Sequence, residues 1–278
     1  MMRISASAAG VADAGFIPYL AGCMKQLPNL LTLGNLFCGT LSLVFILQSP
    51  CYISSYNGQD YLVTAPEPLF WGSVLIGMAA ILDFADGLVA RWMKAASEMG
   101  KQLDSLADVV TFGVAPAMIL FQLLKNAYMQ LPDAINVSII NLAFTLLLPC
   151  FAAWRLARFN IQSSGQHYFT GLPTPAAGLL IASFPLVLLK DTFHLSTYLQ
   201  NIWILYAILI LLCYLMVSRI PMFSFKFSHF GWKQNWYRYV WILLFLAGII
   251  WLGTAAIIGG FVLYILLSLL ARKQLLSE

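Results

Sequence analysis

The sequence predicts an all-α fold, a polytopic membrane helix bundle in which a six-helix core precedes a C-terminal two-helix hairpin, with eight spans in all. Two observations support this prediction. The 278 residues are 61% apolar and 9% charged, and their mean hydropathy is +0.83, a composition typical of membrane proteins rather than soluble domains. The apolar residues also gather in runs long enough to cross a bilayer, which takes about 20 residues.

Six apolar runs have the length of one span each, and they cover residues 29–49, 68–90, 104–124, 137–158, 173–189 and 199–218. The last run, residues 239–271, is too long for one span. As a single helix it would measure roughly 50 Å, against a hydrocarbon core of about 30 Å. We therefore expect two short spans that turn near Gly253 and Thr254, with one long tilted helix as the alternative.

Basic residues are distributed unevenly between the two faces that eight spans define. Of the 15 Lys and Arg, all but Lys125 and Lys190 lie on the face that also carries both chain ends. The positive-inside rule assigns this face to the cytoplasm. We expect a multi-pass protein of the inner (cytoplasmic) membrane with both termini in the cytoplasm. We attribute the net charge of +4 to attraction to anionic lipid headgroups and not to nucleic acid binding.

The first residues differ in composition from the rest of the chain. Leu20–Cys23 resembles a lipoprotein cleavage box, but Asp13 and the weak apolar run before the box argue against a signal peptide. We expect a disordered or amphipathic lead-in, with a translation start at Met24 as an alternative. The predicted parts are this lead-in over residues 1–24, a transmembrane core over 25–230 and a transmembrane hairpin over 231–278.

Four carboxylates lie close together in a chain that is otherwise apolar, and they are Asp83, Asp86, Asp104 and Asp108. The first two are spaced i,i+3 and the last two i,i+4, so each pair shares one face of a helix. In or beside a membrane, four such groups would repel one another and lose hydration. Divalent cations relieve both problems, and Mg²⁺-like ions prefer carboxylate oxygen. The spacing therefore predicts a two-metal site between two helices.

Two other interpretations of these carboxylates remain open at this point. A structural salt-bridge cluster could form with the cations that are close in the sequence, Arg91, Lys94 and Lys101. A cation transporter could use the four aspartates as its ion site. Such transporters often carry broken helices or repeated halves, and the sequence has no visible repeat.

Small residues accompany the carboxylates at fixed spacing. The pattern D-x2-D-G-x2-A-R-x8-G-x3-D-x3-D is filled by Asp83, Asp86, Gly87, Ala90, Arg91, Gly100, Asp104 and Asp108. It resembles the defining motif of the CDP-alcohol phosphotransferases, integral membrane enzymes that move a substituted phosphate from a cytidine diphosphate carrier to an alcohol. Eight matched positions are far more specific than a lone glycine-rich loop.

The resemblance implies a role for each motif position. The four aspartates would hold two Mg²⁺ or Mn²⁺ ions, and Asp108 would also be the general base, although spacing alone does not separate it from the other three. The face with Gly87 and Ala90 would receive the cytidine, and Arg91 would help to hold the diphosphate. The positions assigned in this way to the CDP-lipid are Thr32, Gly87, Ala90, Arg91 and Gly100. Homodimers are usual in this family, so we expect one here.

The acceptor alcohol is suggested by four further segments. Residues 28–39, 107–116, 155–160 and 171–175 resemble the bacterial phosphatidylserine synthases of this family. The implied reaction transfers a phosphatidyl group from CDP-diacylglycerol to L-serine and gives phosphatidylserine and CMP. Glycerol 3-phosphate or an inositol phosphate is the alternative acceptor.

Serine carries a carboxylate, which a guanidinium binds well. Arg155 and Arg158 share a helix face near the cytoplasmic end of the fourth predicted span, and Asn35 is a polar group within the first. We expect these three residues to bind the acceptor. Both arginines could instead anchor the span to anionic lipid headgroups, and Asn35 could serve helix packing.

Overall fold

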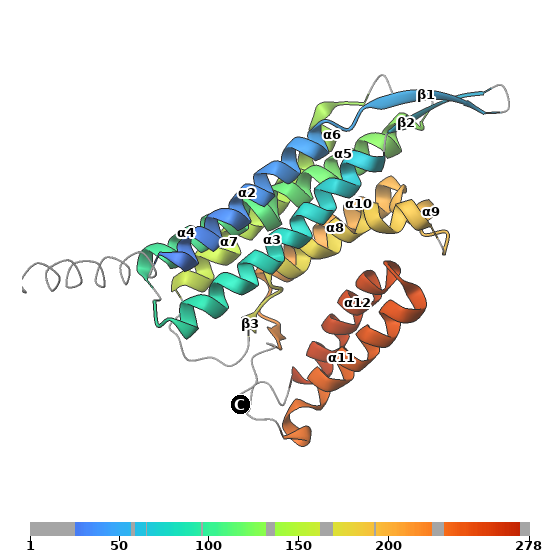
Figure 1. The fold of residues 1–278 in the computed structure, drawn as a ribbon. Coiled ribbons are helices and arrows are strands. Elements are labelled where there is room, and N and C mark those ends of the chain that lie inside the picture. Colours follow the sequence, from blue (N-terminus) through green and yellow to red (C-terminus); the bar gives the residue numbers. More distant parts are fainter. Residues whose placement is uncertain are drawn as a thin grey trace, which may run out of the picture.

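The structure is a computed structural model and describes residues 26–56, 59–64, 66–95, 97–131, 137–161, 169–191, 193–223 and 231–272. The lead-in expected over residues 1–24, with its alternative start at Met24, lies outside these residues. The described part is dominated by helices, with two short antiparallel two-stranded sheets (Figure 1), so the predicted all-α class is confirmed.

The described residues up to Ile161 form four long helical segments. In order they are α2 (Leu27–Leu47), α3 (Pro66–Trp92), a continuous rod of α4 (Glu98–Asp108), η1 (Val109–Val114) and α5 (Ala115–Met129), and a rod of α6 (Ile139–Ala143), η3 (Phe144–Leu146) and α7 (Leu147–Ile161). The remaining helices are α8 (Thr174–Lys190), the short α9 (Ser196–Leu199), α10 (Ile202–Val217), α11 (Trp232–Leu252) and α12 (Ala255–Leu270).

Each of the predicted spans corresponds to one of these apolar helical segments. Five of the segments are long and apolar enough to cross a membrane, while α8, α10 and α12 are shorter. The chain is thus a multi-pass membrane protein, and the number of eight crossings stays a prediction. The last apolar run does break where expected, because Gly253 ends α11 with φ +58° and α12 begins at Ala255. The alternative of one long tilted helix is wrong.

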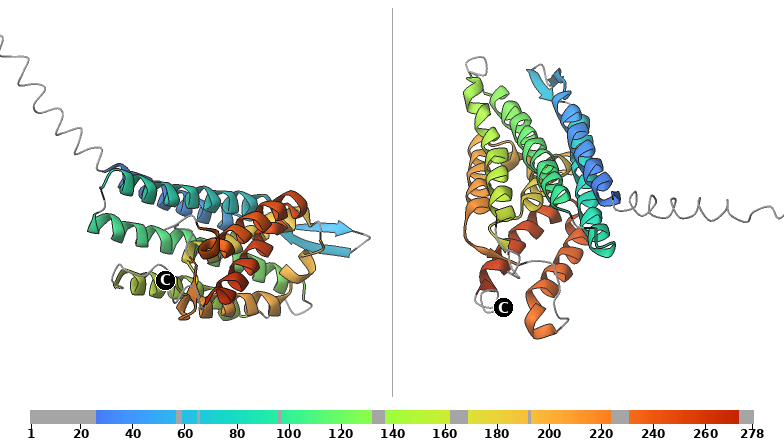
Figure 2. Two further views of the ribbon diagram at one scale, coloured as in Figure 1. Left: turned by 90° about the horizontal axis from the view of Figure 1, so that it is seen from below. Right: turned by 90° about the vertical axis from the view of Figure 1, so that its left-hand side faces the viewer.

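The sequence interpretation missed the strands. Strand β1 (Cys51–Tyr56) pairs with β2 (Gln59–Thr64), and their ladder extends beyond one end of the bundle (Figures 1 and 2). Strand β3 (Phe169–Thr170) pairs with β4 (Pro221–Met222) and joins the approach to α8 with the end of α10. The Asn-Gly pair at residues 57–58, between two runs with aromatic and β-branched residues, was an available hairpin signal.

Helix α2 shows how a membrane chain packs without a hydrophobic driving force. Its buried positions include Thr32, Asn35, Gly39 and Ser42, while four of its leucines, Leu27, Leu30, Leu33 and Leu47, are exposed. Small and polar residues let helices approach closely and hydrogen-bond within lipid. Position 39 requires a glycine, because a Cβ there would lie only 2.9 Å from the Cα of Thr111 on the neighbouring helical rod.

The rod from Glu98 to Met129 runs through the centre of the bundle and is the most buried of the five long helices. Its middle section, η1, is a π-helix that begins directly after Asp108. Such widened turns are rare and are frequent at functional sites. Gly178 of α8 packs against this turn, because a Cβ there would lie 2.9 Å from the Cα of Phe112. The backbone around Asp108 is therefore fixed by close helix contacts.

The ends of α3 and α7 and the start of α4 gather at the end of the bundle opposite the β1–β2 ladder (Figure 1). Arg91 lies in the last turn of α3 and Arg158 in the last turn of α7. The helices α11 and α12 pack against each other, and α12 also contacts α8 and β4. Residues of this pair and of the helices that carry the acidic motif border one cavity.

Candidate active site

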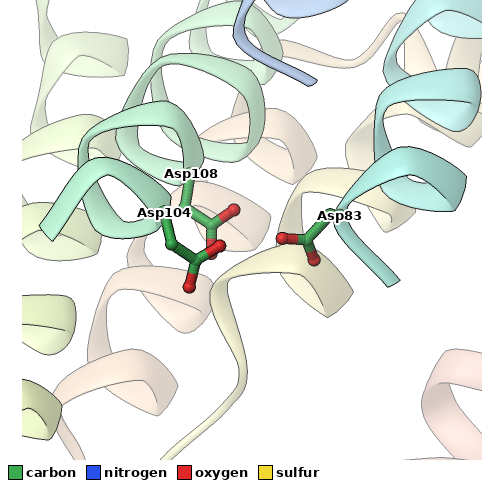
Figure 3. Close-up of side chains that lie close together, drawn as sticks. All are labelled: Asp83, Asp104 and Asp108. Atoms are coloured by element: carbon green, nitrogen blue, oxygen red, sulfur yellow. The ribbon is translucent and has the colours of Figure 1, made fainter. Parts of the chain in front are cut away.

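Three of the four motif carboxylates converge. Asp83 extends from α3 toward Asp104 and Asp108, which lie one turn apart on α4 (Figure 3). One carboxylate oxygen from each residue lies within 4.8 Å of the others. Two helices thus bring their acidic faces together, as the i,i+3 and i,i+4 spacing predicts.

The fourth carboxylate, Asp86, is held beside this triad rather than within it. The Thr32 hydroxyl of α2 donates a hydrogen bond of 2.6 Å to Asp86 Oδ2. Both side chains are buried. Asp86 borders the same two cavities as Asp104, so it remains next to the triad and available to a ligand there.

The chemistry of the triad fits a divalent cation. All three donors are carboxylates, which hard ions such as Mg²⁺ and Mn²⁺ prefer. Asp108 is only 6% exposed, and its Oδ1 has no hydrogen-bond partner among the described residues. A buried carboxylate oxygen without a partner is costly unless a cation or proton accompanies it. The alternative salt-bridge cluster is disfavoured, because Arg91 Nε and Lys101 Nζ donate to the main-chain carbonyls of Gly87 and Asn160.

A cavity of about 900 Å³ opens beside the triad. Its wall includes residues of α3, α4, α7, α8, α11 and α12. The charged residues on this wall are Asp83, Asp86, Asp104, Asp108, Arg91, Lys101 and Arg155. We call this space the large cavity.

A second cavity of about 220 Å³, the small cavity, lies between the start of α2, the end of α3 and the start of α4. Thr32, Gly87, Ala90 and Gly100 border it, which are four of the five positions assigned to the CDP-lipid. A Cβ on Gly87 would meet no atom within 4 Å, so the glycine here leaves open space instead of serving a helix contact. The fifth position, Arg91, borders the large cavity.

Four residues border both cavities and mark where they adjoin: Asp86, Gly87, Lys101 and Asp104. A ligand that fills both spaces must therefore pass two carboxylates and one ammonium. A diphosphate between a nucleoside and a lipid would have this position.

The three residues expected to bind the acceptor lie in different surroundings. Arg155 borders the large cavity, is 8% exposed, and lies within electrostatic reach of Asp108. Its Nη1 donates to Thr174 Oγ1 at 3.2 Å, and its Nε has no partner among the described residues. Arg158 borders neither cavity and donates to the carbonyl of Val217 at 3.3 Å, which ties α7 to α10. Asn35 is fully buried and also borders neither cavity.

Some residues of the site were not among those assigned to metal, CDP-lipid or acceptor from the sequence. The Asn160 side chain donates to Ser105 Oγ at 2.7 Å, and its carbonyl accepts from Lys101 Nζ at 2.9 Å, so the end of α7 is fastened to α4 beside Asp104. Lys101 directly follows the motif residue Gly100, a position that could have suggested a role. Tyr264 of α12 also borders the large cavity, and nothing in its apolar surroundings distinguished it.

Comparisons with known proteins agree with this geometry. A profile described as CDP-alcohol phosphatidyltransferase matches residues 25–269, which include α11 and all but the last residue of α12. A protein of Bacillus subtilis named CDP-diacylglycerol–serine O-phosphatidyltransferase is 35% identical over 212 residues, 74% of this chain and 92% of the relative. A protein of the same name from Helicobacter pylori is 34% identical over 223 residues, 79% of each chain. An archaetidylserine synthase of Methanothermobacter thermautotrophicus is 32% identical over 160 residues, 57% of each chain.

The profile covers most of the chain, and the first two relatives share more than 30% identity over most of their own length. These matches favour an enzyme over the alternative cation transporter. The chain belongs to the CDP-alcohol phosphatidyltransferase family, membrane-embedded transferases of phospholipid biosynthesis.

Proposed function

We propose that this enzyme transfers a phosphatidyl group from CDP-diacylglycerol to L-serine and forms phosphatidylserine and CMP. The observation that carries the proposal is the buried Arg155, which borders the same cavity as the carboxylate triad. The names of the relatives from Bacillus subtilis and Helicobacter pylori support serine as the acceptor.

Arg155 would bind the serine carboxylate. A guanidinium offers several N–H donors in one plane and grips a carboxylate through two of them. Thr174 occupies one donor of Arg155, and Nε has no partner among the described residues. Since Arg155 lies within electrostatic reach of Asp108, a serine held there could turn its hydroxyl toward Asp108.

Glycerol 3-phosphate or an inositol phosphate would bring a phosphate group to the same place. Such acceptors need several cations around the pocket. Besides Arg155, the cations on the described wall of the large cavity are Arg91 and Lys101, and both already donate to carbonyls. This supports serine over a phosphorylated acceptor.

Asp83, Asp86, Asp104 and Asp108 would hold two ions of Mg²⁺ or Mn²⁺. When bound, these ions supply neutralisation of the negative charge on the diphosphate and on the leaving CMP. The small cavity would take the cytidine against Gly87 and Ala90, and Thr32 would keep Asp86 oriented.

Asp108 would act as the general base. The serine hydroxyl oxygen attacks the phosphorus that carries the diacylglycerol, while its proton passes to Asp108. The new bond joins the serine oxygen to that phosphorus, and the bond from phosphorus to the CMP oxygen breaks. Because Asp108 Oδ1 is buried and has no partner among the described residues, it is suited to accept this proton.

The same proposal includes the surroundings of the enzyme. We place it in the inner membrane with both termini in the cytoplasm, because the basic ends of α3 and α7 gather with the start of α4 at one end of the bundle. The active site would then lie at the cytoplasmic interface. We also propose a homodimer, and a division into a core over residues 25–230 and a hairpin over 231–278.

An assay with the purified full-length protein tests the function. CDP-diacylglycerol is offered with serine, glycerol 3-phosphate or inositol phosphate, and the products are identified by lipid mass spectrometry. We expect phosphatidylserine and CMP with serine alone. Product from glycerol 3-phosphate and none from serine would overturn the acceptor and leave the transferase chemistry standing. Metal flux in liposomes without CMP release would favour a transporter.

A further inference from the structure

The C-terminal pair of helices supplies an aromatic wall to the large cavity. Trp241 and Phe245 of α11 and Ile257, Phe261 and Tyr264 of α12 border it. None of these side chains carries a charge. The motif carboxylates border the same cavity from α3 and α4, so the space has an acidic side and an apolar side.

Helices α3 and α8 add further apolar residues to the lining of the cavity. These residues are Phe84 and Leu88 of α3 and Leu179 and Leu180 of α8. A ligand whose charged part lies at the carboxylates and whose remainder is hydrocarbon would match both sides of this space. The CDP-lipid is such a ligand, which makes its acyl chains the occupant best suited to the apolar side.

One glycine sets the position of the aromatic wall. The rings of Trp241 and Phe245 stack with centroids 4.7 Å apart and planes inclined by 15°. Trp241 Nε1 donates to the carbonyl of Gly260 at 2.8 Å. A Cβ on Gly260 would come within 2.7 Å of Phe245 Cε2, so the absence of a side chain there lets the Phe245 ring lie against α12.

We propose that this wall is an acyl-chain site, and that the contact between Gly260 and Phe245 sets which chain lengths the enzyme accepts. The inference rests on the proposed use of a CDP-diacylglycerol. An acyl chain entering from the bilayer leaves surroundings as apolar as the cavity, so burial alone does not discriminate between chains. Discrimination must come from van der Waals fit and steric exclusion, which the Phe245 ring controls.

The test is a competition between CDP-dilauroylglycerol and CDP-dioleoylglycerol in equal amounts, with the purified full-length enzyme. Consumption of each CDP-lipid is measured by mass spectrometry with whichever acceptor is active. Gly260→Ala should displace the Phe245 ring into the cavity and shift the consumption ratio toward the shorter chains. The expected shift in the ratio is roughly tenfold, which is the lower end of the discrimination that one methyl or methylene group gives in an apolar pocket.

Gly259→Ala is the matched control, because a Cβ there meets no atom within 4 Å. It should leave the ratio unchanged. Phe245→Leu replaces the ring with a smaller side chain and should shift the consumption ratio toward oleoyl chains. This second variant keeps the test decisive if Gly260→Ala does not fold.

Unchanged ratios in Gly260→Ala and Phe245→Leu enzymes that fold and turn over would overturn the inference, and would mean that ordinary bilayer lipid fills this space. That result is distinct from failure of the proposed function. If serine is not the acceptor, the ratio is still measurable with another alcohol. If no CDP-lipid is consumed by the unaltered enzyme, both proposals fail.

Discussion

Thr32 and Asp86 join α2 to the acidic motif through a hydrogen bond of 2.6 Å between the Thr32 hydroxyl and Asp86 Oδ2. Both side chains are buried, and both border the small cavity. A carboxylate that binds a metal ion needs a fixed direction, and a neighbouring donor provides it. Thr32 therefore orients a motif residue from a helix that carries none of the four carboxylates.

Thr32→Val tests this orientation, since valine has a similar shape and no hydroxyl. Loss of an outer-shell partner typically costs 10–100-fold in metal affinity or activity, so we expect a rise of roughly tenfold in the Mn²⁺ concentration needed for half-maximal activity. Thr40→Val is the control on the same helix, because the Thr40 hydroxyl donates only to carbonyls of its own helix. Equal Mn²⁺ dependence in both variants would show that Asp86 needs no help from Thr32.

Metal removal tests the carboxylate site as a whole. Activity should vanish with EDTA and return with Mg²⁺ or Mn²⁺, because the carboxylates need cations to accept an anionic diphosphate. Asp83→Asn and Asp104→Asn should each weaken metal binding and rate, measured as Mn²⁺ titrations of turnover. Glu67→Gln is the matched control, an exposed acid in the first turn of α3 that borders neither cavity. Full activity after exhaustive chelation is the outcome that the two-metal proposal does not survive.

The helical segments and the convergence of the acidic faces were predictable from the sequence. Span length and apolar composition are local properties, and the break at Gly253 follows from a run too long for one bilayer crossing. The spacing of Asp104 and Asp108 fixes their common face once the segment is helical. By contrast, the π-helix after Asp108 packs closely against Gly178 at Phe112, and no local pattern reveals such a long-range contact.

The sequence could not predict that Arg155 and Arg158 have different roles. It also could not predict that the C-terminal pair, α11 and α12, borders the large cavity. Both arginines lie on one helix face, and their different partners, Thr174 on α8 and Val217 on α10, come from the tertiary arrangement. The wall around Phe245 was hidden for a related reason. In lipid, an apolar sequence does not specify which of its faces packs against protein.

Asp108→Asn tests the general base. The variant should still bind the CDP-lipid and metal, because an amide oxygen remains, but it should lose turnover, because the serine hydroxyl keeps its proton. General-base catalysis contributes typically 10²–10⁴-fold, so the fall in kcat should be at least about 10²-fold. Binding is followed with a non-transferable CDP-lipid analogue, and turnover by CMP release. If binding weakens as severely as in Asp83→Asn, Asp108 is chiefly a metal ligand and another group takes the proton.

Arg155 and Arg158 share one face of α7 but have different partners, so a Lys substitution at each position should have different effects. Arg155→Lys keeps the charge in the large cavity and loses the planar pair of donors that fits a carboxylate. It should raise the KM for serine by roughly tenfold, about the value of one charge-assisted hydrogen bond, and change the KM for CDP-diacylglycerol much less. Arg158→Lys is the matched control, since Arg158 borders neither cavity and holds the carbonyl of Val217. It should leave both KM values near those of the unaltered enzyme. A serine KM that rises in Arg158→Lys and not in Arg155→Lys would move the acceptor site away from the carboxylate cavity, toward the contact between α7 and α10.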